Sequence, residues 1–171
     1  KNGLGFKTEK NFEANLKEDQ YINYANFLAT VLQHFEKAGT PFRYISPVNE
    51  PQWDWSAMFG QMNQEGSPWH NKDIYKIATT LDSVLLSKKM STQMLITEAG
   101  DLHSLYEGQS RSGRQIQDFY NPGSQLFVGN LKTMHKVIEG HSYFTEATDS
   151  NMISVRKKVL DTAAKYKVPF W

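Results

Sequence analysis

Apolar residues recur at helical spacing in three long stretches of the chain, and each stretch has one apolar face. This spacing predicts amphipathic helices over residues 19–38, 71–88 and 148–166. Asp19 is placed to cap the first helix. Gly39 is placed to end it in a left-handed conformation, which glycine adopts without strain. Either Thr148 or Asp149 is the expected cap of the last helix.

Shorter apolar runs alternate with these helices and predict strands. The runs cover residues 43–49, 93–98, 137–144 and 168–171. Residues 100–130 are less regular, with a short helix expected around Ile116 and Phe119 and a further helical piece at about 124–136. Strict alternation of helices with short strands is typical of βα units and a parallel sheet, so the chain is expected to have an α/β fold.

Polar and acidic side chains collect where the predicted strands end. They are Asn49 and Glu50, Glu98 and Asp101, and His141 and Tyr143. The carboxyl ends of parallel strands form the active site of a TIM barrel, and they bind ligands in a doubly wound sheet. No glycine-rich turn follows any of these strands, so a nucleotide-binding fold is the weaker alternative.

Composition and charge narrow the classes of partner and mechanism. The chain has 171 residues and a formal net charge of +1, with no long run of one sign, so nothing electrostatic favours a nucleic-acid or anionic-membrane partner. No apolar run reaches the roughly 20 residues that a membrane helix needs. Cysteine is absent, which excludes disulfides and thiolate chemistry. The five histidines lack zinc-site spacing, and we expect no metal or organic cofactor.

Glu50 is the candidate catalytic residue. It follows an apolar strand, and Pro51 ends that strand because proline lacks an N–H group. A strand-end carboxyl group can be held rigidly and partly desolvated, which suits a general acid in glycoside hydrolysis. The alternative is a structural role, in which Glu50 caps the next helix or pairs with Arg43.

Three neighbours of Glu50 are candidate substrate-binding residues. Asn49 has an amide that can both donate to and accept from a sugar hydroxyl, although an Asx turn before the proline is the alternative. Trp53 and Trp55 lie in the long loop 51–69, and their rings suit the apolar faces of sugars. Loop packing is their alternative role, and it is the role we assign to Trp69.

Glu98, His141 and Tyr143 are further candidates at the neighbouring strand ends. Glu98 is expected beside Glu50, either as a second catalytic carboxylate, as a ligand for a sugar hydroxyl or as a group that orients Glu50. His141 and Tyr143 flank Ser142, so both point the same way at a strand end. They can hold a nucleophile or the substrate, or form a hydrogen-bonded pair in the core.

The string Ser46-Pro47-Val48-Asn49-Glu50-Pro51-Gln52-Trp53-Asp54-Trp55 carries a family resemblance. It resembles the retaining (β/α)8 glycosidases whose fourth strand ends in Asn-Glu-Pro, and the longer string resembles glycoside hydrolase family 30, which contains endo-β-1,6-galactanases and glucosylceramidases. The runs Lys1-Asn2-Gly3, Ile96-Thr97-Glu98-Ala99-Gly100 and Gly140-His141-Ser142-Tyr143 support it.

The resemblance implies roles for several residues and an expected extent of the domain. Glu50 matches the acid/base, and Asn49 matches the residue that contacts the sugar 2-hydroxyl. Residues 1–171 are then a single segment of a TIM (β/α)8 domain, about strands 4 to 7 with their helices, truncated at both ends. The family's nucleophilic glutamate would follow Trp171. We therefore expect the segment alone to lack glycosidase activity.

The resemblance also implies a setting for the parent protein. It would be a secreted or periplasmic enzyme acting on a polysaccharide or glycoconjugate. An open half-barrel exposes strand edges, which favours association into a homo-oligomer. The alternative from another class is a noncatalytic carbohydrate-binding or partner-binding module that uses Trp53 and Trp55.

Overall fold

The computed structural model describes residues 12–56, 64–108 and 112–171, and it has an α/β fold. Its three long helices are α1 (Tyr21–Lys37), α2 (Asn71–Ser87) and α5 (Asp149–Lys165). Two short helices, α3 (His103–Tyr106) and α4 (Gln115–Tyr120), lie between α2 and α5. The predicted long helices are confirmed, because the helical period of apolar residues is a local signal.

The extended segments are parallel, and segments that follow one another along the chain lie side by side. Strand β1 (Tyr44–Ile45) pairs in parallel with β2 (Gln93–Met94). Isolated parallel bridges extend this pairing: Met94 to Met134, Ala99 to Gly140, and Ile138 to Phe170. The parallel direction is therefore confirmed for these pairs, whereas regular strand structure is much shorter than predicted. Pro47 and the left-handed backbone of Glu50 (φ 45°) both interrupt the ladder after β1.

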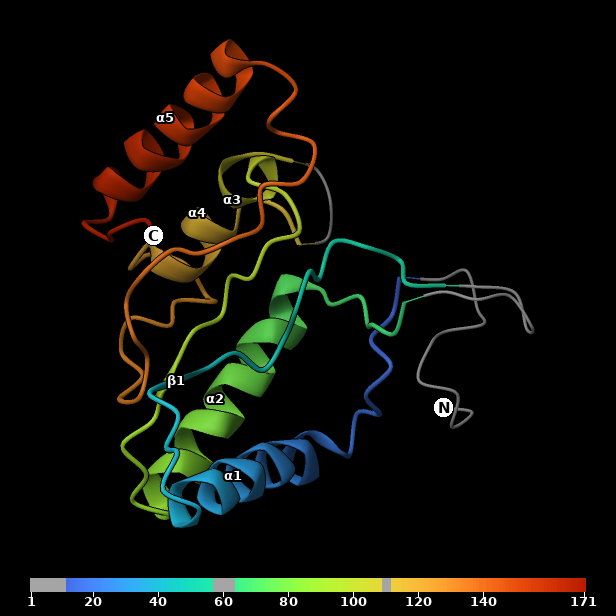
Figure 1. Cartoon of the computed structure of the whole chain (residues 1–171), viewed down its shortest axis with the longest axis vertical. Coiled ribbons are helices and arrows are strands. Elements are labelled where there is room, and N and C mark those ends of the chain that lie inside the picture. The colour runs from blue at the N-terminus through green and yellow to red at the C-terminus, as the bar shows by residue number, and fades with distance from the viewer. Residues whose placement is uncertain (1–11, 57–63, 109–111) are drawn as a thin grey trace.

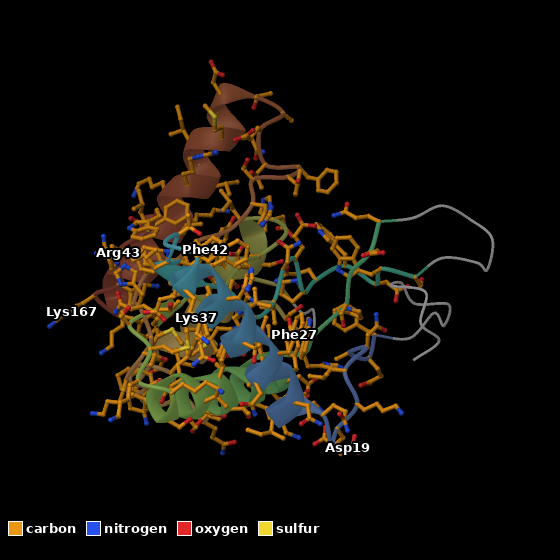
Figure 2. The ribbon with its side chains drawn as sticks, turned by 60° about the horizontal axis from the view of Figure 1, so that its bottom comes forward. Asp19, Phe27, Lys37, Phe42, Arg43 and Lys167 are labelled. Carbon is orange, nitrogen blue, oxygen red and sulfur yellow. The ribbon has the colours of Figure 1, made fainter. Side chains whose placement is uncertain are left out.

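The core lies between the helices and one side of these extended segments (Figure 1). Helix α2 contributes the largest share, with Ile74, Ile77, Ala78, Leu81 and Leu85 all fully buried. Helix α1 packs beside α2 through a face that includes Ala25 and Ala29, whose small side chains permit close approach. Asp19 lies just before the start of α1, and Lys37 is its last residue (Figure 2).

Several sequence-based expectations for the fold are wrong. Asp19 does not cap α1, since Gln20 occupies the capping position and no side chain caps the helix. The apolar spacing over residues 19–38 also includes Phe35, but this residue is 38% exposed and packs edge-on against Phe42 instead of in the core. Gly39 does adopt the expected left-handed conformation, with φ at 83°.

No helix forms over residues 124–136, all of which the structure describes. Long-range contacts hold this segment in turns and extended structure. The Val128 N–H donates to the Phe119 carbonyl (2.9 Å), and both the N–H and the hydroxyl of Thr133 donate to buried Asp82 (2.7 and 2.8 Å). Tertiary hydrogen bonds therefore override the local helical pattern.

Two further expectations concern the N-terminal run of the family resemblance and the absence of a membrane helix. The Lys1-Asn2-Gly3 run of the family resemblance lies outside the described residues. Within the described ranges, none of the helices combines the length and the apolar character required to cross a bilayer.

Thr148 caps α5, as the sequence suggested, because its hydroxyl accepts the Asn151 N–H at 3.1 Å. We expect Thr148→Ala to lower the free energy of unfolding by about 1 kcal/mol, the usual effect of losing an N-terminal cap. Urea denaturation followed by circular dichroism measures this change. Ser154→Ala, at an exposed position inside the same helix, is the matched control and should change stability little. An equal loss in both variants would contradict the capping role.

Candidate active site

Glu50 ends the first extended segment in a tightly held backbone conformation. Its N–H donates to the Glu98 carbonyl on the neighbouring segment at 2.9 Å. Its own carbonyl accepts the Trp53 N–H at 3.3 Å and the Trp55 indole N–H at 3.1 Å. The left-handed φ of 45° is costly for a residue other than glycine, so it persists because these bonds hold it.

The carboxylate of Glu50 is buried and contacts two ring nitrogens. Its side chain is only 8% exposed. One oxygen lies 3.0 Å from His141 Nδ1, and the other accepts the Trp53 indole N–H at 3.1 Å. The second ring nitrogen of His141 lies 3.3 Å from a Glu98 oxygen. A single imidazole therefore bridges two carboxyl groups from neighbouring strand ends.

Each ring nitrogen of His141 can carry a proton toward the carboxyl oxygen that it contacts. The Nδ1 atom, 3.0 Å from Glu50, is therefore placed to exchange a proton with this carboxyl group. Such proximity between a carboxyl group and a proton donor or acceptor suits general acid–base chemistry.

Aromatic rings gather beside this cluster. Tyr143 stacks on His141, with ring centroids 5.6 Å apart, so the expectation that both point the same way is confirmed. Trp53 lies against Gly100, where a β-carbon would come within 2.5 Å of its indole nitrogen. The ring of Phe144 packs edge-on against Trp53 with centroids 5.9 Å apart, and Phe144 is 83% exposed.

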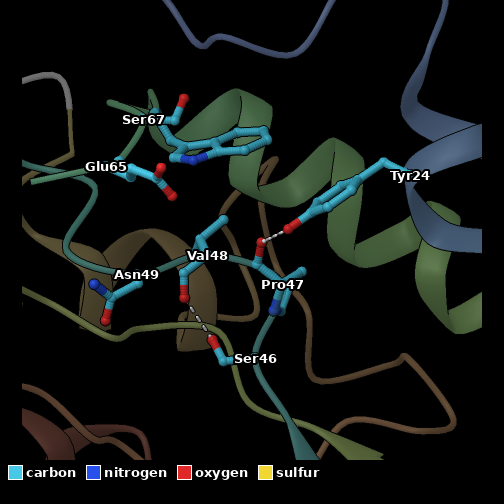
Figure 3. A pocket seen from close by; sticks show the side chains of 9 residues that line it. Tyr24, Ser46, Pro47, Val48, Asn49, Glu65 and Ser67 are labelled. Atoms are coloured by element: carbon cyan, nitrogen blue, oxygen red, sulfur yellow. Dashed lines mark hydrogen bonds between the residues drawn. The ribbon is translucent and has the colours of Figure 1, made fainter. Parts of the chain in front are cut away.

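Two of the predicted substrate-binding residues lie away from the Glu50 carboxylate. The ring of Trp55 is buried, packs closely against Gly66 and donates to the main chain of Glu50. Asn49 is exposed and lines a separate cavity of about 610 Å³ together with Glu65 and Trp69 (Figure 3). Glu50 does not line this cavity, so Asn49 and Glu50 face different spaces.

Sequence reasoning missed two residues of this region, Phe144 and Glu139. Phe144 adopts a left-handed backbone (φ 63°), and its only sequence signal is its place next to Tyr143. Glu139 interrupts an apolar run, Val137-Ile138-Glu139, and that interruption was the available signal. It lines a cavity of about 570 Å³ together with Glu98 and His141.

Burial sets the protonation of Glu139. Desolvation and, to a smaller extent, the negative charge of Glu98 raise the pKa of its carboxyl group, which stands at about 7 instead of 4.5. Hydrogen bonds from Thr97 and from the Glu98 main chain oppose this shift by stabilising the charged form. The group therefore changes charge near neutral pH, beside the cluster of Glu50, His141 and Glu98.

Asp101 has a local structural role. Its carboxylate accepts the N–H groups of His103 and Ser104 at 2.9 and 3.2 Å, at the start of α3.

The described residues contain no group of three or more His, Cys, Asp or Glu side chains that could hold a metal ion.

Comparison with protein families gives a match over the whole chain. A family model described as O-glycosyl hydrolase family 30 matches residues 1–171. No curated protein matches the sequence.

Three solved structures resemble the fold. A conserved exported protein from Bacteroides fragilis is 26% identical, with a TM-score of 0.86 over 98% of this chain and 34% of its own. An endo-β-1,6-glucanase is 15% identical, with a TM-score of 0.57 over 85% of this chain and 28% of its own. A family 30 subfamily 8 xylanase from Clostridium acetobutylicum is 18% identical, with a TM-score of 0.54 over 91% of this chain and 31% of its own. The chain thus spans about a third of the length of these proteins.

Proposed function

Because this chain belongs to O-glycosyl hydrolase family 30, we propose that it forms part of the catalytic unit of a retaining β-glycosidase, with Glu50 as the general acid/base. The observation that carries the proposal is the buried Glu50 carboxylate, which contacts the ring nitrogen of His141 at 3.0 Å and the indole nitrogen of Trp53 at 3.1 Å. Its proton supply and partial desolvation suit proton transfer to a leaving oxygen.

The proposed reaction has two steps. In the first, Glu50 protonates the glycosidic oxygen as a second carboxylate attacks the sugar and forms a covalent intermediate. In the second, Glu50 takes a proton from the water that hydrolyses this intermediate. The His141 ring nitrogen 3.0 Å from Glu50 is proposed to exchange protons with it, and Glu98 contacts the imidazole from its other side.

The second carboxylate is proposed to come from outside residues 1–171. Retaining enzymes place their two carboxyl groups about 5–5.5 Å apart across the sugar. Glu98 shares one imidazole with Glu50 and comes from the adjacent segment, which suits an orienting role better than attack from the opposite side. The proposed architecture is a TIM (β/α)8 barrel to which residues 1–171 contribute one segment, about strands 4 to 7, as the parallel order of the extended segments supports.

The proposed substrate is a β-linked polysaccharide or glycoconjugate. Trp53, Tyr143 and Phe144 surround the cluster, and the last two are 53% and 83% exposed. Aromatic faces of this kind pack on the apolar C–H faces of sugars. Asn49 has no proposed contact with this sugar, because its side chain lines the separate cavity. Trp55 is proposed to act through the Glu50 carbonyl that it contacts. The mechanism needs no metal or organic cofactor.

Two further proposals concern the parent protein. An exported or secreted location is supported by the similarity to the exported Bacteroides protein. Association of residues 1–171 into a homo-oligomer is supported by exposed apolar side chains such as Phe27 and Trp171, which are 61% and 59% exposed.

A test of the proposed function compares residues 1–171 with the same segment inside a complete family 30 polypeptide. We expect the complete polypeptide to hydrolyse a β-glucan, β-galactan or xylan with net retention, because two carboxyl groups then flank the bond. Proton NMR of the first-formed anomer measures the stereochemistry. We expect no turnover by residues 1–171 alone, since one carboxylate cannot complete both steps.

Two outcomes would contradict this proposal. Inversion of the anomer would exclude the retaining mechanism, and turnover by residues 1–171 that Glu50→Gln abolishes would place both carboxylates in this segment. Sugar binding without turnover by the complete polypeptide would instead favour the noncatalytic carbohydrate-binding module.

A further inference from the structure

Side chains replace main-chain pairing where the segment after β2 approaches the segment that contains Glu139. Parallel bridges form at Met94–Met134 and at Ala99–Gly140. Between them the Thr97 hydroxyl donates to the Glu139 carbonyl at 2.7 Å and accepts the Glu139 N–H at 3.1 Å. The Glu139 carboxyl oxygen Oε1 in turn accepts the N–H groups of Thr97 and Glu98 at 3.0 and 3.4 Å.

These bonds hold a strained turn next to the candidate active site. Glu98 has a left-handed backbone (φ 40°), as does Glu50 (φ 45°). For residues with a side chain, such conformations persist only when their surroundings determine them. The Glu98 N–H is bound by the Glu139 carboxyl, and the Glu98 carbonyl accepts the Glu50 N–H at 2.9 Å. A continuous hydrogen-bonded path thus leads from the Glu139 side chain to the backbone of Glu50.

We infer that Glu139 is a positioning residue, which fixes the Thr97–Glu98 turn and thereby sets the Glu98 and Glu50 carboxylates against the two ring nitrogens of His141. Both carboxylates contact the imidazole, at 3.3 and 3.0 Å, so the inferred role predicts that a change in either backbone displaces a carboxylate from its ring nitrogen. The inference rests on the proposed function for the role of Glu50, whereas the contacts that carry it do not depend on that role.

The surroundings of Glu139 explain why a neutral carboxyl group suits this position. Its second oxygen, Oε2, is buried and has no hydrogen-bond partner among the described residues. The ionisable groups that face it are Glu98 and Tyr120, whose hydroxyl donates to the Val137 carbonyl at 2.9 Å. His141 and Tyr143 line the same cavity as Glu139. A third negative charge here would repel Glu98. Glutamine keeps the Oε1 acceptor without that charge, so it should preserve the turn.

The test measures amide hydrogen exchange in ¹⁵N-labelled residues 1–171. We expect Glu139→Ala to accelerate exchange of the Glu98 and Glu50 amides by about 10-fold or more relative to the Leu81 amide in the core of α2. Glu139→Gln should leave this ratio unchanged, since the acceptor remains. Val137→Ala is the control for general destabilisation, because it creates a cavity at a fully buried position of the same segment. It should also leave the exchange ratio unchanged.

A second measurement tests the positioning role of Glu139 if Glu139→Ala does not fold. In the unmodified chain the Thr97 and Glu98 amide protons should shift together with a midpoint near pH 7, the pKa of Glu139, and Glu139→Gln should abolish this shift. The inference is wrong if the Thr97 and Glu98 amide protons show no such shift or keep it in Glu139→Gln, or if Val137→Ala accelerates Glu50 exchange as much as Glu139→Ala. Because neither readout requires turnover, failure of the proposed glycosidase function would be seen separately.

Discussion

Replacing Glu50 with glutamine in the complete polypeptide should lower kcat on an unactivated β-glycan by roughly 10²- to 10⁴-fold, the usual contribution of general acid–base catalysis. The amide cannot donate a proton to the leaving oxygen or accept one from water. It still fits the buried site, because it can accept the Trp53 indole N–H and meet a ring nitrogen of His141. Steady-state assays of reducing-sugar release measure this loss.

The choice of leaving group distinguishes loss of proton transfer from general damage. An aryl glycoside with an acidic phenol needs little protonation on departure, so its first step should be nearly normal in Glu50→Gln. The second step then becomes slow, because no base activates water. Azide needs no base and should restore turnover, giving a glycosyl azide of retained configuration.

Glu36→Gln is the matched control, since Glu36 is exposed near the end of α1 and is not one of the cluster residues. It should leave kcat unchanged. Full activity of Glu50→Gln on a polysaccharide, at unchanged thermal stability, would show that Glu50 is not the acid/base.

Glu139 should make the folded chain less stable as the pH rises toward neutral. In the unfolded chain its carboxyl group loses its proton near pH 4.5, whereas in the folded chain the pKa is about 7. Between these values the folded state binds more protons, so the free energy of unfolding contributed by this group is highest below pH 4.5 and falls until the pH passes about 7. At about 1.4 kcal/mol per pKa unit, the full change is on the order of 3 kcal/mol.

Urea denaturation of the unmodified chain and of Glu139→Gln, at several pH values from 4 to 8, measures this effect. As the pH rises, we expect the unmodified chain to lose stability relative to Glu139→Gln. The difference between their unfolding free energies should change by about 3 kcal/mol. Other carboxyl groups cancel in the comparison, and Glu36→Gln should show no such trend. A difference independent of pH would mean that Glu139 is solvated or already charged in the folded chain.

Helices were predicted well because their signal is local. Each of the three long helices carries its apolar face at 3.6-residue spacing, and packing of α2 buries that face completely. The strands were predicted too long, because part of their pairing is made by side chains. Thr97 and Glu139 replace main-chain bonds, and Pro47 cannot donate one. The helix expected over residues 124–136 was lost to the long-range bonds of Val128 and Thr133.

The candidate site was predicted as a set of residue types but not as a set of contacts. Parallel strands bring their carboxyl ends together, so Glu50, Glu98 and His141 were expected near one another, and the ion-pair distances confirm their proximity. Their catalytic roles remain predictions. Asn49 and Trp55 were grouped with them by closeness in sequence. The left-handed turn at Glu50 separates the two neighbours, so Asn49 lines another cavity, and loop packing buries Trp55.

The sequence by itself determined the α/β alternation, the parallel direction of the extended segments and the acid that follows the first of them. These features depend on local periodicity and on the string Ser46–Trp55. Only the tertiary structure decided that one imidazole bridges two carboxyl groups and that the buried carboxyl of Glu139 holds the turn behind them. Such contacts join residues more than 40 positions apart. Their energies depend on burial and on distances of about 3 Å, which no local pattern of residues encodes.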